Sequence, residues 1–188
     1  MSVDDLVQGS SLTPPKPPQF IRWNAPPPGS TKINFDGSLQ NLSAAGGFIM
    51  RDWRGAVVMI GTSNYGSTSI MVAEGRALKD GIQAASAAGY NRLHIEGDNL
   101  TVIEALQGKT SIPWQLTNII QDIHVMLSQV EQVVVNHIYR ESNMAADSLS
   151  KYGHSILGQF KATKCRIPEL RSILRDDMLG RTFVRRDA

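Results

Sequence analysis

Residues 31–65 read TKINFDGSLQNLSAAGGFIMRDWRGAVVMIGTSNY and hold three β-prone runs that only short turns separate. The first run, at residues 31–39, alternates apolar and polar side chains, as a strand with one buried face does. Gly46 and Gly47 open a second run, and the RDWRG turn at residues 51–55 leads into a third. Three strands in so short a stretch predict an antiparallel meander.

After the meander the hydrophobic pattern changes to a helical period. Residues 69–88 carry one apolar stripe, made of Ile70, Ala73, Ala77, Leu78, Ile82 and Ala85. The following segments read as a strand at 92–98, helices at 99–108 and 114–130, a strand at 131–140 and a final helix at 142–153. This order predicts an α/β fold, in which a mixed five-stranded sheet has helices on both faces.

Length and composition suit one hydrophobic core. With 188 residues and 41% hydrophobic content, a second full domain is not expected. We expect a proline-rich flexible lead-in at residues 1–29, which contains PPKPP and APPPG, a folded domain at 30–155, and a basic, partly helical C-terminal extension at 156–188.

The cysteine count and the N-terminus bear on location. Cys165 is the single cysteine, which excludes an internal disulfide and favours a reducing compartment. The start MSVDDLVQGSS has neither the basic nor the apolar region of a secretory signal, and no apolar run is long enough to span a bilayer. We therefore expect an intracellular protein, nuclear or cytoplasmic, that has no membrane partner.

Charge is distributed unevenly along the chain. Residues 31–155 hold nine Lys and Arg against eleven Asp and Glu, a net −2, whereas residues 156–188 hold eight against four, a net +4. A nucleic-acid partner would find its cations mainly in this tail, although tail charge can also merely keep a terminus in solution. Helical spacing after Pro168 favours docking of the tail on the body over a mobile basic arm.

Four carboxylates occupy positions where an acid is costly to bury without a cation. Asp36 and Asp98 lie where a β-prone run ends or meets glycine, and Glu74 and Asp147 lie on the apolar faces of helical segments. Oxygen ligands without cysteine suit a hard cation such as Mg²⁺ or Mn²⁺. Single members of the set could be helix caps or surface charges, but together they favour a metal site for phosphoryl transfer.

The chain resembles the type 1 ribonuclease H family, and within it the plant reverse-transcriptase-like subgroup related to retrotransposon domains. The resemblance covers about residues 20–155 and rests on RWNAPPPGSTKINFDGSL, AEGRALKDGI, IEGDN and HIYRESNMAADSLSK. It implies a ribonuclease H-like fold in which two Mg²⁺ ions, with Mn²⁺ as an alternative, are held by Asp36, Glu74, Asp98 and Asp147. It also implies hydrolysis of the RNA strand of an RNA–DNA hybrid, leaving 5′-phosphate and 3′-hydroxyl ends, and we expect a monomer.

The resemblance also implies residues that contact the substrate. Gly37 and Ser38 would let RNA approach Asp36 closely and touch a ribose 2′-hydroxyl, although ordinary turn chemistry also explains them. Asn99 and Asn143 are further candidates, while Asn99 is equally suited to cap a helix and Asn143 to cap a helix or hold a loop.

His137 and Arg140 are alternative helpers in catalysis, and the resemblance leaves the choice between them open. His137 lies in a strand-like run, where a half-buried histidine needs no catalytic explanation. Where bacterial relatives carry a basic protrusion, the segment QGKTSIPWQL at residues 107–116 offers only Lys109 and Trp114. Hybrid affinity should therefore be modest and sensitive to salt.

Three functions remain candidates. The complete set of acids favours a hybrid-cleaving endonuclease. The missing protrusion and the nearly neutral body favour a nucleic-acid-binding module of the same fold that has weak or no turnover. The proline-rich start also fits the ribonuclease H part of a longer retroelement polyprotein.

Overall fold

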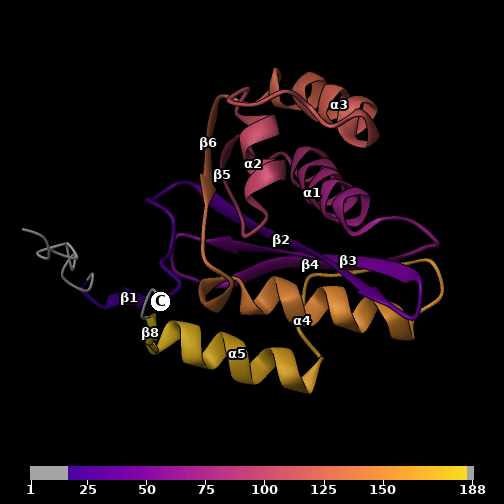
Figure 1. The fold of residues 1–188 in the computed structure, drawn as a ribbon. Coiled ribbons are helices and arrows are strands. Elements are labelled where there is room, and N and C mark those ends of the chain that lie inside the picture. Colours follow the sequence, from indigo (N-terminus) through magenta and orange to yellow (C-terminus); the bar gives the residue numbers. More distant parts are fainter. Residues whose placement is uncertain (1–16, 186–188) are drawn as a thin grey trace, which may run out of the picture.

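A six-stranded mixed sheet forms the centre of the molecule, as shown by a computed structural model that describes residues 17–185 (Figure 1). Strands β2 (Thr31–Gln40), β3 (Ser43–Asp52) and β4 (Val57–Gly66) form the predicted antiparallel meander. The β2–β3 turn places Asn41 and Leu42 at positive φ values of 48° and 64°.

Two further strands run parallel to β2. Strand β5 (Arg92–Gly97) pairs with β2, and β6 (Gln132–His137) pairs with β5. Asn34 lies opposite Glu96 in this register, so Asp36 within β2 and Asp98 directly after β5, each two residues later, come to neighbouring positions. The parallel pairing thus brings two of the four acids together.

Helices cover both faces of the sheet, which confirms the predicted α/β architecture (Figure 1). On one face lie α1 (Ile70–Ala87), α2 (Leu100–Leu106) and α3 (Thr117–Leu127), and on the other lie α4 (Met144–Tyr152) and α5 (Pro168–Met178). A 3₁₀ turn, η1 (Trp114–Leu116), precedes α3. No helix in residues 17–185 is both long and apolar enough to cross a membrane.

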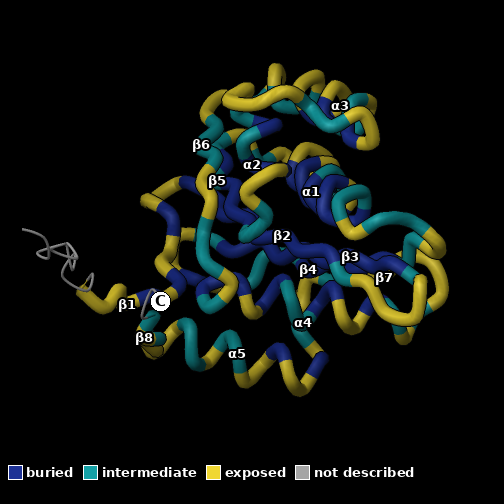
Figure 2. The backbone as a smooth tube through the Cα atoms, viewed as in Figure 1, coloured by how far each residue is buried: buried dark blue, intermediate teal, exposed yellow. Residues whose placement is uncertain are grey.

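Each face of the sheet has its own hydrophobic core (Figure 2). Alternating side chains of one strand point to opposite faces, so Phe48 packs on the α1 side while Ile49 packs on the α4 side. Ile33, Phe35, Leu78 and Ile82 complete the centre of the first core, and Ile60, Leu149 and Leu170 that of the second. This two-sided burial fixes the register of β2 and hence the side on which Asp36 points.

Two glycines let helices lie directly on the sheet. A Cβ atom at Gly37 would lie 2.6 Å from the backbone nitrogen of Glu74. A Cβ atom at Gly47 would lie 2.5 Å from the Cβ of Leu149 and from the backbone nitrogen of Ser150. Because side-chain atoms do not tolerate such contacts, only glycine permits α1 and α4 to approach this closely.

The sheet has one strand more than the five predicted. Strand β7 (Gln159–Ala162), from the C-terminal extension, pairs antiparallel with β4. Strands β1 (Gln19–Ile21) and β8 (Phe183–Arg185) form a separate two-stranded sheet. Strands of three or four residues carry too little alternation to be recognised from sequence, which explains why these strands were not predicted.

The packed residues extend beyond positions 30 and 155. Of the predicted lead-in, residues 1–16 lie outside the described residues, whereas Ile21 and Trp23 are buried. In the C-terminal extension, Ile167 and Leu170 join the core on the α4 side. Buried residues within 17–29 and within 156–185 therefore form part of the folded unit.

A buried cation joins the two terminal segments. The guanidinium of Arg51, on β3, forms an ion pair with Asp177 of α5 at 2.6 Å and lies 3.6 Å from the ring centre of Trp23. Asn34 accepts hydrogen bonds from Trp23 Nε1 at 3.1 Å and from Arg51 Nη2 at 3.3 Å. These contacts connect β2 and β3 to α5 and to Trp23.

Candidate active site

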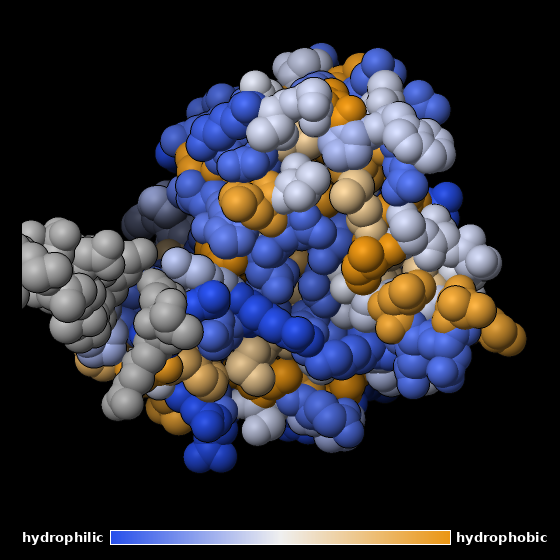
Figure 3. Space-filling model, viewed as in Figure 1, coloured by the Kyte–Doolittle hydropathy of each residue, from blue (hydrophilic) through white to orange (hydrophobic). Residues whose placement is uncertain are grey.

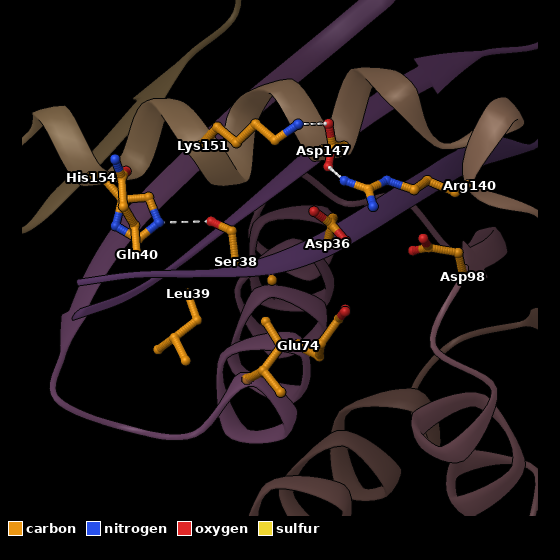
Figure 4. Close-up of a pocket in the computed structure, with 12 residues that line it drawn as sticks. Asp36, Ser38, Leu39, Gln40, Glu74, Asp98, Arg140, Asp147, Lys151 and His154 are labelled. Carbon is orange, nitrogen blue, oxygen red and sulfur yellow. Dashed lines mark hydrogen bonds and ion pairs between the residues drawn. The ribbon is translucent and has the colours of Figure 1, made fainter. Parts of the chain in front are cut away.

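A pocket of about 810 Å³ opens where β2 ends, between α1 and α4, and all four predicted acids line it (Figure 4). Asp36 comes from β2, Glu74 from α1 and Asp147 from α4, while Asp98 directly follows β5. Four elements that are distant in sequence thus converge on one hollow. Hydrophilic side chains cover the middle of the face shown in Figure 3.

Three of the acids come within reach of one cation. Asp36, Glu74 and Asp98 each offer a carboxylate oxygen, and these oxygens lie within 4.8 Å of one another. Asp147 stands apart from this group, because its carboxylate accepts from Arg140 at 2.8 Å and from Lys151 at 2.5 Å. The structure therefore groups three acids and holds the fourth beside them with two cations.

Burial makes two of the grouped acids, Glu74 and Asp36, resist ionisation. It raises the pKa of Glu74 to about 9, and the charges of Asp36 and Asp98 add to this. Burial likewise raises the pKa of Asp36 to about 7, where the hydrogen bond from Ser150 opposes it and the charges of Asp98 and Asp147 add to it. A divalent cation between these oxygens would relieve both effects.

The environment of Glu74 fits a metal ligand. Its Oε2 atom is buried and has no hydrogen-bond partner, which is costly for a carboxylate oxygen. Hydrogen bonds from the backbone of Gly37 and the side chain of Asn99 act against the rise in its pKa. A hard cation coordinated by oxygen atoms would satisfy the orphaned atom, so the residues present fit Mg²⁺ or Mn²⁺.

Gly37 and Asn99 therefore have structural tasks at the predicted site. Gly37 permits the close approach of α1 described above. The Asn99 side chain caps α2 by accepting from the backbone N–H of Val102 at 3.2 Å. Both residues thus support the position of Glu74 or of its neighbours, whether or not they also contact a substrate.

Asn143 holds one of the acids in place. It is 1% exposed, and its Nδ2 donates to the carbonyl oxygen of Phe35 and to Asp98 Oδ1, both at 2.9 Å. These contacts join the start of α4 to β2 and fix the carboxylate of Asp98. These contacts give Asn143 a positioning role, and its contact with a substrate stays a prediction.

Arg140 and His137 separate clearly in space. Arg140 lines the pocket, and its hydrogen bond to Asp147 raises the pKa of its guanidinium. His137 does not line this pocket; its Nε2 donates to the carbonyl oxygen of Asp98 at 3.1 Å. It lines a different cavity, of about 560 Å³, beside β1. Only Arg140 of the two faces the grouped acids.

Several residues in or beside the pocket were not predicted from the sequence. Ser150 donates to Asp36 Oδ2 at 2.6 Å. Figure 4 shows Lys151 paired with Asp147 and His154 beside Ser38, whose Oγ lies 2.9 Å from His154 Nε2. The sequence did contain a signal for Lys151: it lies four residues after Asp147, the spacing at which side chains on a helix meet. His154 carried none, since its partner is 116 positions earlier.

Trp114 does not take the packing role that is usual for a tryptophan. Trp114 is 83% exposed and lines a cavity of about 540 Å³ together with Arg76 and Lys79. Lys79 is paired there with Asp122 at 2.5 Å, so the surface is not a strongly basic one. The structure thus supplies no counterpart of a basic protrusion at this place.

Comparison with known proteins places this geometry in a family. The family model described as reverse transcriptase-like matches residues 34–153, which include all four acids. An Arabidopsis thaliana protein, named as a candidate ribonuclease H protein, is 30% identical over 178 residues. That alignment covers 93% of this chain but 28% of the Arabidopsis protein, so the chain spans little more than a quarter of its relative's length.

Solved structures show the same fold. RNase H1 from Halobacterium salinarum is 23% identical, with a TM-score of 0.64 over 67% of this chain and 98% of the archaeal one. LC11-RNase H1, solved in complex with an RNA/DNA hybrid, is 22% identical, with a TM-score of 0.61 over 65% and 94% of the two chains. The foamy viral protease-reverse transcriptase in complex with an RNA/DNA hybrid is 15% identical, with a TM-score of 0.55 over 68% of this chain and 20% of the viral one. The chain therefore has a ribonuclease H-like fold and belongs to the reverse transcriptase-like family.

Proposed function

We propose that the protein is a metal-dependent endonuclease that hydrolyses the RNA strand of RNA–DNA hybrids. The observation that carries the proposal is the grouping of Asp36, Glu74 and Asp98, whose oxygens lie within 4.8 Å of one another around a buried, unpartnered Glu74 oxygen. Carboxylates are held this close at a cost unless a cation joins them. The ribonuclease H-like fold, and hybrid-bound structures of two proteins that share it, support the choice of substrate.

Asp36, Glu74 and Asp98 would hold one divalent cation, and Asp147 is the candidate for sharing a second with Asp36. Such ions lower the pKa of an attacking water and stabilise the oxygen that leaves the phosphate. Either Mg²⁺ or Mn²⁺ fits this set of ligands. The products would carry 5′-phosphate and 3′-hydroxyl ends.

The surrounding side chains orient the acids. Ser150 fixes Asp36 through its 2.6 Å hydrogen bond, and Asn143 fixes Asp98 at 2.9 Å. Each hydrogen bond favours one orientation of its carboxylate before a substrate binds. Such preorganisation lowers the barrier to reaction.

Arg140 and Lys151 supply positive charge at the other side of the pocket. Both side chains are largely exposed, at 67% and 59%, while the Asp147 carboxylate that they share is 18% exposed. They are placed to attract the phosphate backbone and to balance charge as it develops on the phosphoryl group. This arrangement makes Arg140, rather than His137, our candidate for assisting catalysis.

The test is cleavage of an end-labelled RNA–DNA hybrid in Mg²⁺ and in Mn²⁺. We expect wild-type protein to cut the hybrid and to leave double-stranded DNA and double-stranded RNA intact. Asp98→Asn should lower the rate by at least about 100-fold, because it removes one negative ligand of the ion. Asp122→Asn is the matched control, since this exposed acid pairs with Lys79 outside the pocket and should cut at the wild-type rate.

Absence of cutting in both metals, together with measurable hybrid binding, would refute the proposal and favour a binding module of the same fold. The observation that supports this alternative is the pairing of the Asp147 carboxylate with two cations, Arg140 and Lys151. Cutting that Asp98→Asn leaves intact would instead point to a contaminating nuclease.

A second proposal concerns the context of the domain. The Arabidopsis relative extends well beyond the matched region, and this supports an origin as the ribonuclease H part of a longer retroelement protein. Sequencing of full-length transcripts across this region tests it, since an upstream polymerase-like reading frame joined to residue 1 is the expected result.

A further inference from the structure

A second cavity lies beside the candidate active site. It has a volume of about 560 Å³ and is formed by residues 19–24, which include β1, and by residues 137–142, which lead from β6 towards α4. The matched family region, residues 34–153, does not include the first of these segments. We propose that this cavity binds an unpaired nucleotide where one strand of the substrate continues beyond the hybrid. The inference deepens the proposed function and rests on it, because it requires a hybrid bound at the acids.

A single wall separates the cavity from the candidate active site. His137 and Tyr139 line the cavity, whereas the neighbouring Arg140 lines the pocket that holds the acids. His137 Nε2 donates to the carbonyl oxygen of Asp98 at 3.1 Å, so the wall lies directly against one of the acids. Figure 1 shows β1 and β8 beside the segment that connects β6 to α4. A nucleic-acid strand that passes Arg140 on leaving the acids therefore meets this cavity next.

Aromatic rings line the cavity, and one of them is strongly exposed. Phe20 is 71% exposed although it lies on a paired strand whose next residue, Ile21, is buried. The rings of His137 and Tyr139 meet edge to face, with centroids 6.0 Å apart and an angle of 78° between their planes. Ordered aromatic rings that face water offer stacking surfaces to nucleobases. Only an unpaired base has a free face for such a ring, because the bases of a duplex stack on one another.

The cavity also contains a cation that no acid neutralises. Within residues 17–185, Arg22 forms no ion pair: its Nε donates to Asn24 Oδ1 at 3.1 Å, and Asn24 Nδ2 donates to the carbonyl oxygen of Arg22 at 3.4 Å. These two contacts orient the guanidinium and leave its other N–H groups able to donate to a phosphate. An aromatic face and a cation in one cavity match the base and the phosphate of a single nucleotide.

The acid in the wall has a cationic partner. Arg185, on β8, lies over the ring of Tyr139 at 4.3 Å, and its Nη1 atom lies 3.8 Å from Glu141 Oε2. This ion pair weakens the repulsion that Glu141 would exert on a phosphate in the cavity. The pairing of β1 with β8 thus brings Phe20 and Arg185 to the same wall from opposite ends of the described chain.

Binding of hybrids with and without overhangs tests the inference. Fluorescence anisotropy in EDTA compares a blunt RNA–DNA hybrid with the same hybrid carrying an overhang of about five nucleotides at each strand end in turn. We expect one of these overhangs to lower Kd about 10-fold, the effect of one stacked base and one phosphate contact. Lengthening the hybrid by the same number of base pairs should change Kd less than about threefold, because paired bases cannot stack on Phe20.

Variants of the cavity assign the effect. Phe20→Ala and Arg22→Gln should each remove most of the gain and leave Kd for the blunt hybrid within about twofold of wild type. On an overhang that lacks bases, Phe20→Ala should have no effect, whereas Arg22→Gln should still weaken binding and lower the slope of log Kd against log salt by about one. Val184→Ala is the matched control, because Val184 is opposite Phe20 in the small sheet and is 55% exposed but does not line the cavity.

Equal affinity for blunt and overhanging hybrids would overturn the inference, and so would a gain that both cavity variants leave intact. A gain of the same size from added base pairs would also overturn it, since that result indicates a contact with the duplex backbone. Protein that prefers an overhang but cuts no hybrid contradicts only the cleavage proposal. Protein that cuts blunt hybrids but does not distinguish overhangs contradicts only the role of the cavity, and protein that binds neither form contradicts both.

Discussion

Replacement of Asp177 by alanine should destabilise the protein by about 3–5 kcal/mol, because it leaves a buried cation without its partner. The Arg51 side chain is 1% exposed and its Nη1 atom lies 2.6 Å from Asp177. Its remaining contacts, the Asn34 oxygen and the Trp23 ring, are uncharged, and its Nε atom has no partner at all. The nearby acid Glu96 is engaged by Lys32 at 2.5 Å and is not free to replace Asp177.

The loss arises from desolvation and not from a strong net attraction. Burial lowers the pKa of Arg51 and raises that of Asp177, although each partner's charge opposes the shift in the other. Both directions mean that desolvation outweighs the attraction within the pair. Breaking the pair is therefore costly, but replacing both residues by apolar ones need not be, so Arg51→Met combined with Asp177→Leu should recover most of the stability.

Urea unfolding and thermal melting measure the effect. For a domain of this size each kcal/mol lost from the free energy of unfolding lowers Tm by roughly 2–4 °C, so the Asp177→Ala variant should melt roughly 6–20 °C below wild type. Asp176→Ala is the matched control: its ion pair with Arg181 is exposed, with side chains 36% and 59% accessible, and its removal should cost about 1 kcal/mol or less. A loss below about 1 kcal/mol in Asp177→Ala, or a double variant as unstable as the single one, would refute the reasoning.

Three other predictions concern the pocket. The raised pKa values of Asp36, from 3.8 to about 7, and of Glu74, from 4.5 to about 9, mean that these acids favour folding at low pH and that this contribution is lost as pH rises through the folded values. In EDTA, Tm should therefore fall between about pH 5 and pH 9, and added Mg²⁺ or Mn²⁺ should raise Tm more at high pH than at low pH; a metal effect independent of pH in differential scanning fluorimetry would contradict this. Gly37→Ala should cost about 1–3 kcal/mol in urea unfolding, because its Cβ would meet the backbone of Glu74 at 2.6 Å, and a neutral result would show that α1 can shift. Arg140→Ala should lower the rate of hybrid cleavage about 10-fold or more while His137→Ala stays within about threefold, and steady-state kinetics showing the reverse order would assign catalysis to the histidine.

Patterns within short segments were enough to predict the central fold. The alternation in residues 31–39 and the apolar stripe that includes Ala77 and Ile82 both depend on which face of one element is buried, and neighbouring residues record this directly. The position of β2 between β3 and β5 then follows from the meander and from the crossover connections.

Contacts between distant segments were not predictable in the same way. Ser150 meets Asp36 across 114 positions and Asp177 meets Arg51 across 126, and nothing in the local sequence of either partner marks the contact. The burial of Arg51 is especially hard to predict, since an arginine on a strand is ordinarily exposed. The acids were predictable because glycine or an apolar run beside each of them signals burial, whereas the residues that orient the acids look like ordinary helix and loop residues.

The pairing of β1 with β8 has a topological consequence. Gln19 lies opposite Arg185 and Ile21 opposite Phe183, so the two ends of the described part of the chain lie side by side, about 5 Å apart between paired Cα atoms. A unit with adjacent ends can be spliced into a loop of another protein without stretching its host, and its own ends can be joined while new ones are opened elsewhere. Circular permutation with a short linker from residue 185 to residue 19 should accordingly leave the sheet and the pocket intact.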